Sequence, residues 1–348
     1  MTSQQTLMKN KIAIVGEAWG EHEERERMPF VGPAGWQLNT LLKEAGIVRH
    51  ECFLTNCFNL RPKPTNKIDN LCASRKEVRH ALPPLSSGKY IRDEFLPELD
   101  RLYRELNEVN PNVIICLGGT AAWAILRDGR ISKLRGAVAS SPILEGRKVL
   151  PTFHPSYILQ GNYESRYVTI LDLQKARRES EYPEIRRPRR TIYTAPSLNE
   201  LEWFLDTHIR PASRLAVDIE TRADRITCIG FAPGPQIALV VPFEDLRQGG
   251  NYWPTIEAEL SAWRWVRRVL DMASPTKIFQ NGIFDMTRLW KTYGIPVRNA
   301  EHDTMLLHHA LMPESPKGLD YLGSIYTDEA AWKLGIRLKH KGTIKKED

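Results

Sequence analysis

Three acidic residues in the second half of the chain have a spacing that could hold a metal ion. Asp218 and Glu220 lie two apart in the apolar run LAVDIET, which has the pattern of a β-strand. Side chains two apart on a strand point to the same side, so these carboxylates are expected to be neighbours. Like charges this close repel each other unless a cation lies between them. Asp285 supplies a third acid, after a second apolar run and at the start of a helical stretch. The pattern indicates a cation site, although such pairs also occur by chance on surface strands.

Polar residues follow the ends of several short apolar runs in the first half of the chain. The runs at 12–15, 52–55, 113–117 and 148–153 end at Gly16, Asn56, Gly118 and His154, respectively. Residues just past the carboxyl ends of parallel strands surround the binding site of an open α/β sheet. Asn56 and His154 are therefore expected to converge with the loop after Gly16. Each one alone indicates little, because a single Asn or His at a strand end is more often a structural hydrogen-bonding group.

Helical stretches separate these apolar runs. The pattern predicts helices at 36–45, 91–108 and 120–126, hence an α/β domain with a mainly parallel sheet over residues 1–180. Residues 181–190 combine prolines with arginines and have no periodicity, which is typical of an exposed linker. Strand-like runs at 191–193, 214–219, 226–231 and 236–241, with helices from 256, predict a second α/β domain over residues 191–348.

The composition indicates a globular protein that is attracted to polyanions. The chain has 348 residues, with 49 Lys and Arg against 42 Asp and Glu, for a net charge of +7. This charge favours nucleic acid as a partner, although a basic enzyme without such a partner fits it equally well. Five widely spaced cysteines predict reduced thiols. No apolar run is long enough to cross a bilayer and no secretory signal is present, so we expect a cytoplasmic protein without a membrane partner.

The segments of the first domain, taken in order, resemble the uracil-DNA glycosylase superfamily. They are GEAWGEHEERERMPFVGPAGWQLNTLLKEAGI, FLTNCFNLRP, VIICLGGTAAWAIL, ISKLRG and LPTFHPSYIL. The resemblance implies a pocket for a base that has left the DNA stack. Phe30 would stack on the base and Asn56 would bind the edge of uracil, while His154 would donate to the oxygen that gains negative charge. Glu17 would position water or stabilise the sugar cation. Phosphate contacts would come from Ser156, Lys133 and Arg135.

Two departures from that superfamily's pattern limit what the resemblance implies. Trp19 stands where proline is usual in the first motif. The iron–sulfur forms of the superfamily carry four cysteines, but none precedes Gly16 here, and Leu60 stands where a cysteine would follow a lysine. We therefore expect no iron–sulfur cluster. An active glycosylase and a glycosylase-like module that only binds DNA both remain open.

The second domain resembles the DEDD-type 3′–5′ exonucleases, in particular the proofreading domains of family A DNA polymerases. The matching segments are VDIET, NGIFD and EHDTMLLHHALMPESPKGLDYLGSIYT. The resemblance implies an RNase H-like (DnaQ-type) fold and two divalent ions, with Asp218 and Glu220 binding the first and Asp285 helping to hold the second. Oxygen ligands favour Mg²⁺ or Mn²⁺. The family's last aspartate, four residues after a Tyr or His, has no match after Thr327, and Asp303 is a poor substitute.

This domain order is seen at the front of some bacteriophage family A replicative polymerases. We therefore predict that the chain is the amino-terminal component of such a polymerase made as two polypeptides. The second polypeptide would bring the missing exonuclease motif and the polymerase domain, and exonuclease activity would belong to the complex. One alternative is a stand-alone uracil-DNA glycosylase that repairs DNA and has an accessory domain. The other is a non-catalytic subunit that binds DNA or serves as a scaffold.

Overall fold

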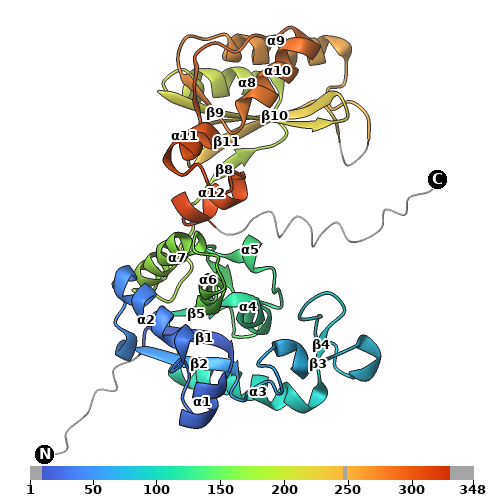
Figure 1. The fold of residues 1–348 in the computed structure, drawn as a ribbon. Helices are drawn as coiled ribbons and strands as arrows, with labels where there is room; N and C mark the ends of the chain where they lie inside the picture. Colours follow the sequence, from blue (N-terminus) through green and yellow to red (C-terminus); the bar gives the residue numbers. More distant parts are fainter. Residues whose placement is uncertain (1–9, 246–248, 330–348) are drawn as a thin grey trace, which may run out of the picture. The chain divides into compact units, whose positions relative to one another are not determined.

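The computed structural model describes residues 10–245 and 249–329 of the chain. These residues form two compact units (Figure 1). The first contains the described residues up to Arg187 together with those from Asp320 onward, and the second is Pro188–Leu319. The break at Arg187 lies inside the segment expected to be a linker. The residues from Asp320 group with the first unit, whereas the sequence placed them in the second domain. Among the described residues, no helix is both long and apolar enough to cross a bilayer.

The first unit is built on a five-stranded sheet with the order β2-β1-β5-β7-β6. Its strands are β1 (Ile12–Ala18), β2 (Cys52–Phe58), β5 (Val113–Leu117), β6 (Ala139–Ser140) and β7 (Lys148–Thr152). All pairs are parallel except β6 with β7. This confirms the mainly parallel α/β domain that the four apolar runs predicted. A separate pair, β3 (Cys72–Ala73) and β4 (Tyr90–Ile91), lies in the long connection after β2.

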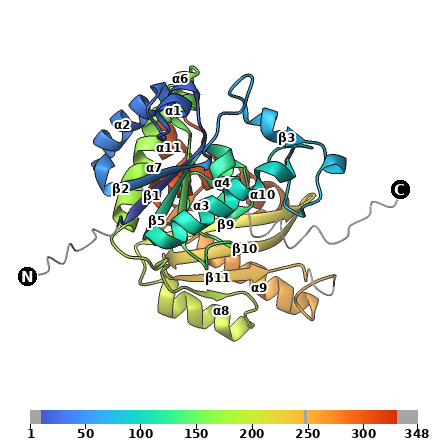
Figure 2. The ribbon, with the colours of Figure 1, turned by 90° about the horizontal axis from the view of Figure 1, so that it is seen from below.

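Both faces of this sheet are covered by helices, which explains why its central strands are largely apolar. Along β1, Ala13 and Val15 belong to one core cluster, while Ile12 and Ile14 belong to the other. The helices are α1 (Glu21–Glu26), α2 (Pro33–Ala45), α3 (Leu96–Val109), α4 (Gly118–Leu126), α5 (Ile131–Leu134), α6 (Pro155–Leu159) and α7 (Ser165–Glu179). Residues of α3 and α4 pack in the first cluster, and residues of α2 and α7 pack in the second, on the other side of the sheet (Figure 2).

The helix expected at 91–108 begins later than the sequence indicated. Ile91 pairs with Cys72 as part of β4, and α3 begins at Leu96 with Pro97 in its first turn. Proline is favoured in the first turn of a helix because the amide hydrogen that it lacks has no partner there. The structure therefore shortens this helix at its amino end.

The second unit is an α/β fold around a six-stranded sheet with the order β13-β12-β9-β10-β11-β8. Its strands are β8 (Thr191–Tyr193), β9 (Arg214–Arg222), β10 (Arg225–Gly234), β11 (Ile237–Pro242), β12 (Thr276–Phe279) and β13 (Ala300–Asp303). The central strands β9, β10 and β11 are antiparallel, and β12, β13 and β8 add in parallel to their neighbours. The helices are α8 (Leu198–Phe204), continued by a π-helical turn at Leu205–Ile209, then α9 (Ile256–Leu270), α10 (Gly282–Tyr293) and α11 (Thr304–Leu311). Helix α12 (Leu319–Tyr326) follows, at the return to the first unit.

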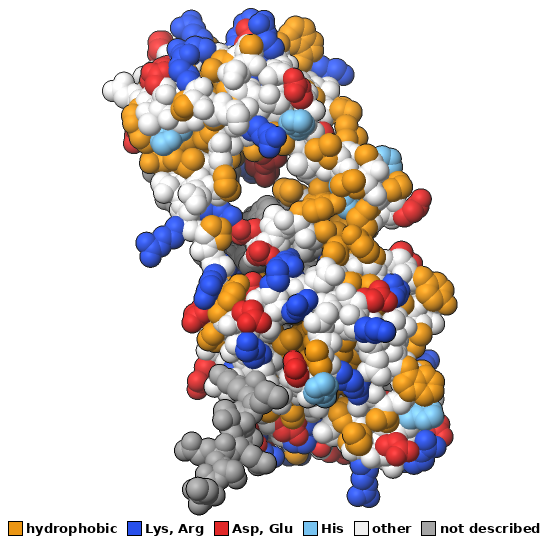
Figure 3. All heavy atoms as spheres, turned by 90° about the vertical axis from the view of Figure 1, so that its left-hand side faces the viewer, with side chains coloured by type: hydrophobic (Ala, Val, Ile, Leu, Met, Phe, Trp, Pro, Cys, Tyr) orange, Lys and Arg blue, Asp and Glu red, His pale blue; other side chains and the backbone are white. Residues whose placement is uncertain are grey.

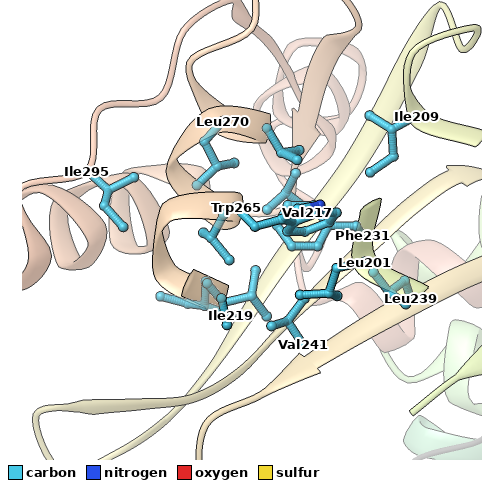
Figure 4. Packing of buried hydrophobic residues seen from close by; sticks show 14 of the residues in the cluster. Leu201, Ile209, Val217, Ile219, Phe231, Leu239, Val241, Trp265, Leu270 and Ile295 are labelled. Atoms are coloured by element: carbon cyan, nitrogen blue, oxygen red, sulfur yellow. The ribbon is translucent and has the colours of Figure 1, made fainter. Parts of the chain in front are cut away.

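The core of the second unit sets the direction of the acidic side chains on β9. Val217 and Ile219 are buried with Phe231 of β10 and Trp265 of α9, as Figure 4 shows. Side chains alternate along a strand, so Asp218 and Glu220 must point to the opposite face of the sheet. The two acids share one face of β9, as the sequence predicted, and both are exposed.

Candidate functional site

A cavity opens at the carboxyl ends of β1, β2 and β7 in the first unit. Its volume is about 730 Å³. The side chains that line it come from segments far apart in the sequence and include Glu17, Trp19, Glu23, Phe30, Asn56, His154 and Ser156. The sequence had predicted that the residues after these strands converge, and the structure brings them together in one cavity.

Two glycines let the aromatic and amide side chains approach the end of β1. A Cβ atom at Gly16 would lie 2.2 Å from Oδ1 of Asn56 and 2.5 Å from Cζ of Phe30. A Cβ at Gly35 would lie 1.9 Å from the carbonyl oxygen of Phe30. Phe30 itself has a φ of 57°, a left-handed conformation that is rare for an aromatic residue. The placement of Phe30 beside Asn56 therefore depends on glycine at both positions.

The backbone around Phe30 is held by Glu23, a residue that the sequence reasoning passed over. The Glu23 carboxylate accepts hydrogen bonds from the backbone N–H groups of Gly20 (3.1 Å), Val31 (3.1 Å) and Gly32 (2.8 Å). Its side chain is buried, and these bonds replace the lost hydration. The signal in the sequence was its position three residues after Gly20 at the start of α1, where glutamate caps a helix. Other glutamates surround Glu23 in residues 21–26, so its position alone did not distinguish it from them.

Glu17 lies half-buried at the end of β1 and accepts a hydrogen bond from one side chain. The Thr120 hydroxyl donates a hydrogen bond of 2.5 Å to Oε2 of Glu17. Burial raises the pKa of Glu17 above its ordinary value, and the bond from Thr120 opposes that rise. This environment keeps the carboxylate basic and orients one oxygen, as a group that positions water or faces a positive sugar requires.

His154 is arranged as a neutral hydrogen-bond donor. The backbone N–H of Ser156 donates to Nδ1 of His154 at 3.2 Å, so a neutral ring carries its proton on Nε2. Burial lowers the pKa of His154 to about 4, and the charge of Glu23 opposes that shift only in part. The ring lies 6.4 Å from the Phe30 ring, with 29° between their planes. At neutral pH the Nε2–H group can therefore donate without carrying a charge.

Asn56 offers its side-chain amide to the cavity. The residue is buried and its backbone carbonyl accepts a hydrogen bond of 2.8 Å from Nη2 of Arg101. Within the part of the chain that the structure describes, the amide itself has no hydrogen-bond partner in the protein. A donor and an acceptor side by side can pair with the edge of a base such as uracil.

The three predicted phosphate contacts fall in different environments. Ser156 lines the cavity at the start of α6, and Lys133 is exposed on α5. Arg135 is buried instead, with Nη2 and Nε bound to the two carboxylate oxygens of Asp172 at 2.5 and 3.0 Å. This placement is at odds with the expected contact of Arg135 to phosphate, because an interior ion pair already uses its guanidinium. On the face drawn in Figure 3, Lys and Arg side chains are interspersed with Asp and Glu.

In the second unit, Asp285 lies against the strand that carries Asp218 and Glu220. It is in the first turn of α10 and only 4% exposed. The backbone N–H of Ile219, between the other two acids, donates to Oδ1 of Asp285 at 3.1 Å. Burial raises the pKa of Asp285 to about 6, the Ile219 bond lowers it and the charge of Asp218 adds to the rise. Negative charge is crowded here, so these oxygen ligands fit a divalent cation.

The three acids do not form a closed ligand set. Across residues 10–245 and 249–329, no three His, Cys, Asp or Glu side chains are grouped closely enough to hold a metal ion. The Asp303 carboxylate is already used in hydrogen bonds within the protein. It accepts hydrogen bonds from the backbone N–H groups of Asn281 (3.1 Å), Gly282 (2.7 Å) and Met305 (2.9 Å). Asp303 therefore caps α11 and ties it to α10. A complete two-cation centre needs ligands beyond those that this face supplies.

Solved structures that resemble the chain include an exonuclease domain. A structure of the EXD2 exonuclease domain soaked in Mg and GMP is 18% identical to this chain, with a TM-score of 0.26. The match covers 35% of this chain and 59% of the EXD2 chain. Brucella melitensis NrnC with bound Mg²⁺ is 19% identical to this chain, with a TM-score of 0.28. That match covers 47% of this chain and 66% of the NrnC chain. These scores are too low to support a conclusion about this chain.

The sequence relatives include a DNA polymerase and uracil-DNA glycosylases. The DNA polymerase of Bacillus phage SP01 is 22% identical over 92% of this chain, which spans a third of the polymerase's length. The Type-4 uracil-DNA glycosylase of Archaeoglobus fulgidus is 32% identical over 47% of this chain and 77% of that enzyme. The Type-4 uracil-DNA glycosylase of Thermotoga maritima is 35% identical over 49% of this chain and 78% of that enzyme. The model of the uracil DNA glycosylase superfamily matches residues 5–174. Through its first unit, this chain belongs to the uracil DNA glycosylase superfamily.

Proposed function

We propose that this chain serves DNA replication as the amino-terminal, proofreading part of a phage-type family A DNA polymerase. The observation that carries the proposal is similarity to a phage DNA polymerase through both units, over 92% of the chain. The geometry of the second unit supports it, because Asp218 and Glu220 share one face of β9 and Asp285 lies against that strand.

The three carboxylates would act on the 3′ end of a DNA strand. Two Mg²⁺ or Mn²⁺ ions, when bound, would supply activation of water and stabilisation of the leaving oxygen. Asp218 and Glu220 are exposed and can reach a cation without a change in the core. Asp285 is tied to β9 by the Ile219 bond, so its carboxylate stays aligned with theirs. With a pKa of about 6, Asp285 is ionised at neutral pH and available as a ligand.

The ligands that complete this centre would come from outside the described residues. In the form of the proposal that the sequence favours, a second polypeptide brings the last acidic residue and the polymerase domain. Such a polypeptide should co-purify with the chain and raise its exonuclease rate.

The experiment is shortening of a 3′-mismatched primer in the presence of Mg²⁺ or Mn²⁺, with the chain alone and with the polymerase polypeptide. We expect degradation mainly in the mixture. Asp218→Ala should reduce it by more than about a hundredfold, because several kcal/mol of transition-state stabilisation are lost. Asp206→Ala, at an exposed position of the π-helical turn in the same unit, is the matched control. Rapid degradation by the chain alone would contradict the two-polypeptide form, and equal rates for Asp218→Ala and the control would contradict the exonuclease role.

The cavity of the first unit supports a second candidate function, the removal of uracil from DNA. The observation that favours it is the open amide of Asn56 beside the Nε2–H donor of His154. Phe30 would stack on the base and Asn56 would bind its edge. His154 would then donate to the oxygen that becomes negative as the bond to the sugar breaks, and Glu17 would face the positive sugar.

Release of free uracil from a labelled single strand tests this activity. Asn56→Asp replaces the amide donor with an acceptor and should lower the rate by more than about a hundredfold, because a buried polar group is left unpaired. His154→Ala should also lose activity, whereas Asn199→Asp on α8 should not. If the unaltered chain releases no uracil, the first unit does not excise bases under these conditions and the replication proposal is unaffected.

A further inference from the structure

The first unit contains a buried pair of cations that contacts the end of α12. Lys175, on α7, donates from Nζ to the carbonyl oxygens of Ser324 and Thr327, both at 2.7 Å, and of Gly136 at 2.8 Å. Arg135 donates from Nη1 to the Ser324 hydroxyl at 2.8 Å. The side chains of Arg135 and Lys175 are 2% and 3% exposed. Helix α12 is thus held by groups that lie inside the first unit.

The charge balance of this cluster explains why it needs the α12 segment. Asp172 is the carboxylate that pairs with Arg135, and it also accepts a bond of 2.7 Å from the Thr152 hydroxyl. Within the first unit's interior one anion therefore faces two cations, and Asp328 of the segment adds a second negative charge that acts on Lys175. A buried ammonium group without hydrogen-bond partners is strongly destabilising. The last carbonyl groups of a helix carry partial negative charge. The carbonyl oxygens of Ser324 and Thr327, at the end of α12, are two of the three acceptors of Lys175.

The shape of the site also matches the segment. Gly136 has a φ of 71°, and a Cβ there would lie 3.0 Å from the carbonyl oxygen of Ser324 and 2.5 Å from Oδ1 of Asp172. The Arg135 guanidinium lies 5.3 Å from the centre of the Tyr321 ring, a distance at which cation and ring attract each other. Charge, hydrogen bonds and a close backbone approach all point to the same occupant.

We propose that the glycosylase-superfamily unit is a docking platform for residues 320–329 of its own chain, with Lys175 and Arg135 as the receptor. The chain leaves this unit at Arg187 and returns to it at Asp320, so the docked segment is the part of the chain that follows the second unit. This role requires no base excision. It gives the unit a structural purpose in a replication protein whether or not its cavity releases uracil.

Hydrogen–deuterium exchange of the full chain, followed by mass spectrometry, tests the proposal. Lys175→Met keeps the apolar stem of the side chain and removes the ammonium group. Peptides that cover residues 320–329 should then exchange faster by about tenfold or more, because two hydrogen bonds to the segment are lost. Lys133→Met, on exposed α5, is the matched control and should leave those peptides unchanged.

A second variant separates docking from damage to the core of the first unit. Ser324→Ala removes the acceptor of Arg135 from the segment side and leaves every residue of the platform in place. Faster exchange in both variants, with unchanged peptides from β1 and β5, would support the platform. Unchanged exchange of residues 320–329 in both would overturn it. The proposal would also fail if Lys175→Met left exchange unchanged but lowered the salt dependence of DNA binding by about one unit, since Lys175 would then be a phosphate ligand.

Discussion

Replacement of Asp285 with Asn should stabilise the chain at neutral pH and weaken its response to divalent cations. The pKa of Asp285 is about 6, against an ordinary value of 3.8, because burial and the charge of Asp218 disfavour its ionised form. A raised pKa means that the ionised carboxylate destabilises the folded state above pH 6. One pKa unit corresponds to about 1.4 kcal/mol, so ionisation of Asp285 lowers the free energy of unfolding by at most about 3 kcal/mol.

The stability that Asp285→Asn is expected to gain does not exceed this maximum. Asn keeps an oxygen that can accept the bond from the Ile219 N–H, so that contact is retained. Solvent and local relaxation screen part of the charge repulsion around Asp285, and we expect a gain of about 1–3 kcal/mol at pH 8. As pH falls from 6 towards 4, the carboxyl group of the folded wild type becomes protonated, so the gain of the variant should shrink over that interval.

Urea denaturation at pH 8 and pH 4.5 measures the gain directly, with Asp206→Asn as the control at an exposed ion pair with Arg210. Repetition at pH 8 with Mg²⁺ tests the cation site. Binding should stabilise the wild type by an amount that grows with the logarithm of the concentration, and should stabilise Asp285→Asn by less, because Asp218 and Glu220 remain as ligands. A variant less stable than the wild type at pH 8, or equally stabilised by Mg²⁺, would refute the argument from crowded charge.

Two further substitutions test the cavity of the first unit. Gly16→Ala places a methyl group against Asn56 and Phe30. The variant should lose about 1–3 kcal/mol of stability. It should also no longer bind uracil, as measured by calorimetry. Gly234→Ala, where a Cβ meets open space, should change neither. Thr120→Val removes the donor to Glu17 and should raise the pKa of that carboxyl further, as followed by NMR of its carboxyl carbon, whereas Thr120→Ser should restore it. Equal Glu17 pKa values in Thr120→Val and the wild type would show that the hydroxyl has no electrostatic role.

The parts of both sites that follow strand geometry could be predicted from the sequence. Asn56 and His154 converge because parallel strands end at one edge of a sheet. Asp218 and Glu220 share a face because side chains alternate along β9, where Val217 and Ile219 are taken by the core. These rules act over a few residues, so the order of apolar and polar side chains is sufficient.

Other features were decided only by contacts between distant parts of the chain. Arg135 was expected to contact phosphate, but it is buried, and its guanidinium binds Asp172 and Ser324 in the folded unit. Glu23 stood out only after the loop at Phe30 placed three backbone donors around it. The sequence alone determined the strands, the strand ends and the chemistry available there. Tertiary structure decided which charged groups are buried and paired, because burial depends on neighbours whose separation along the chain carries no local pattern.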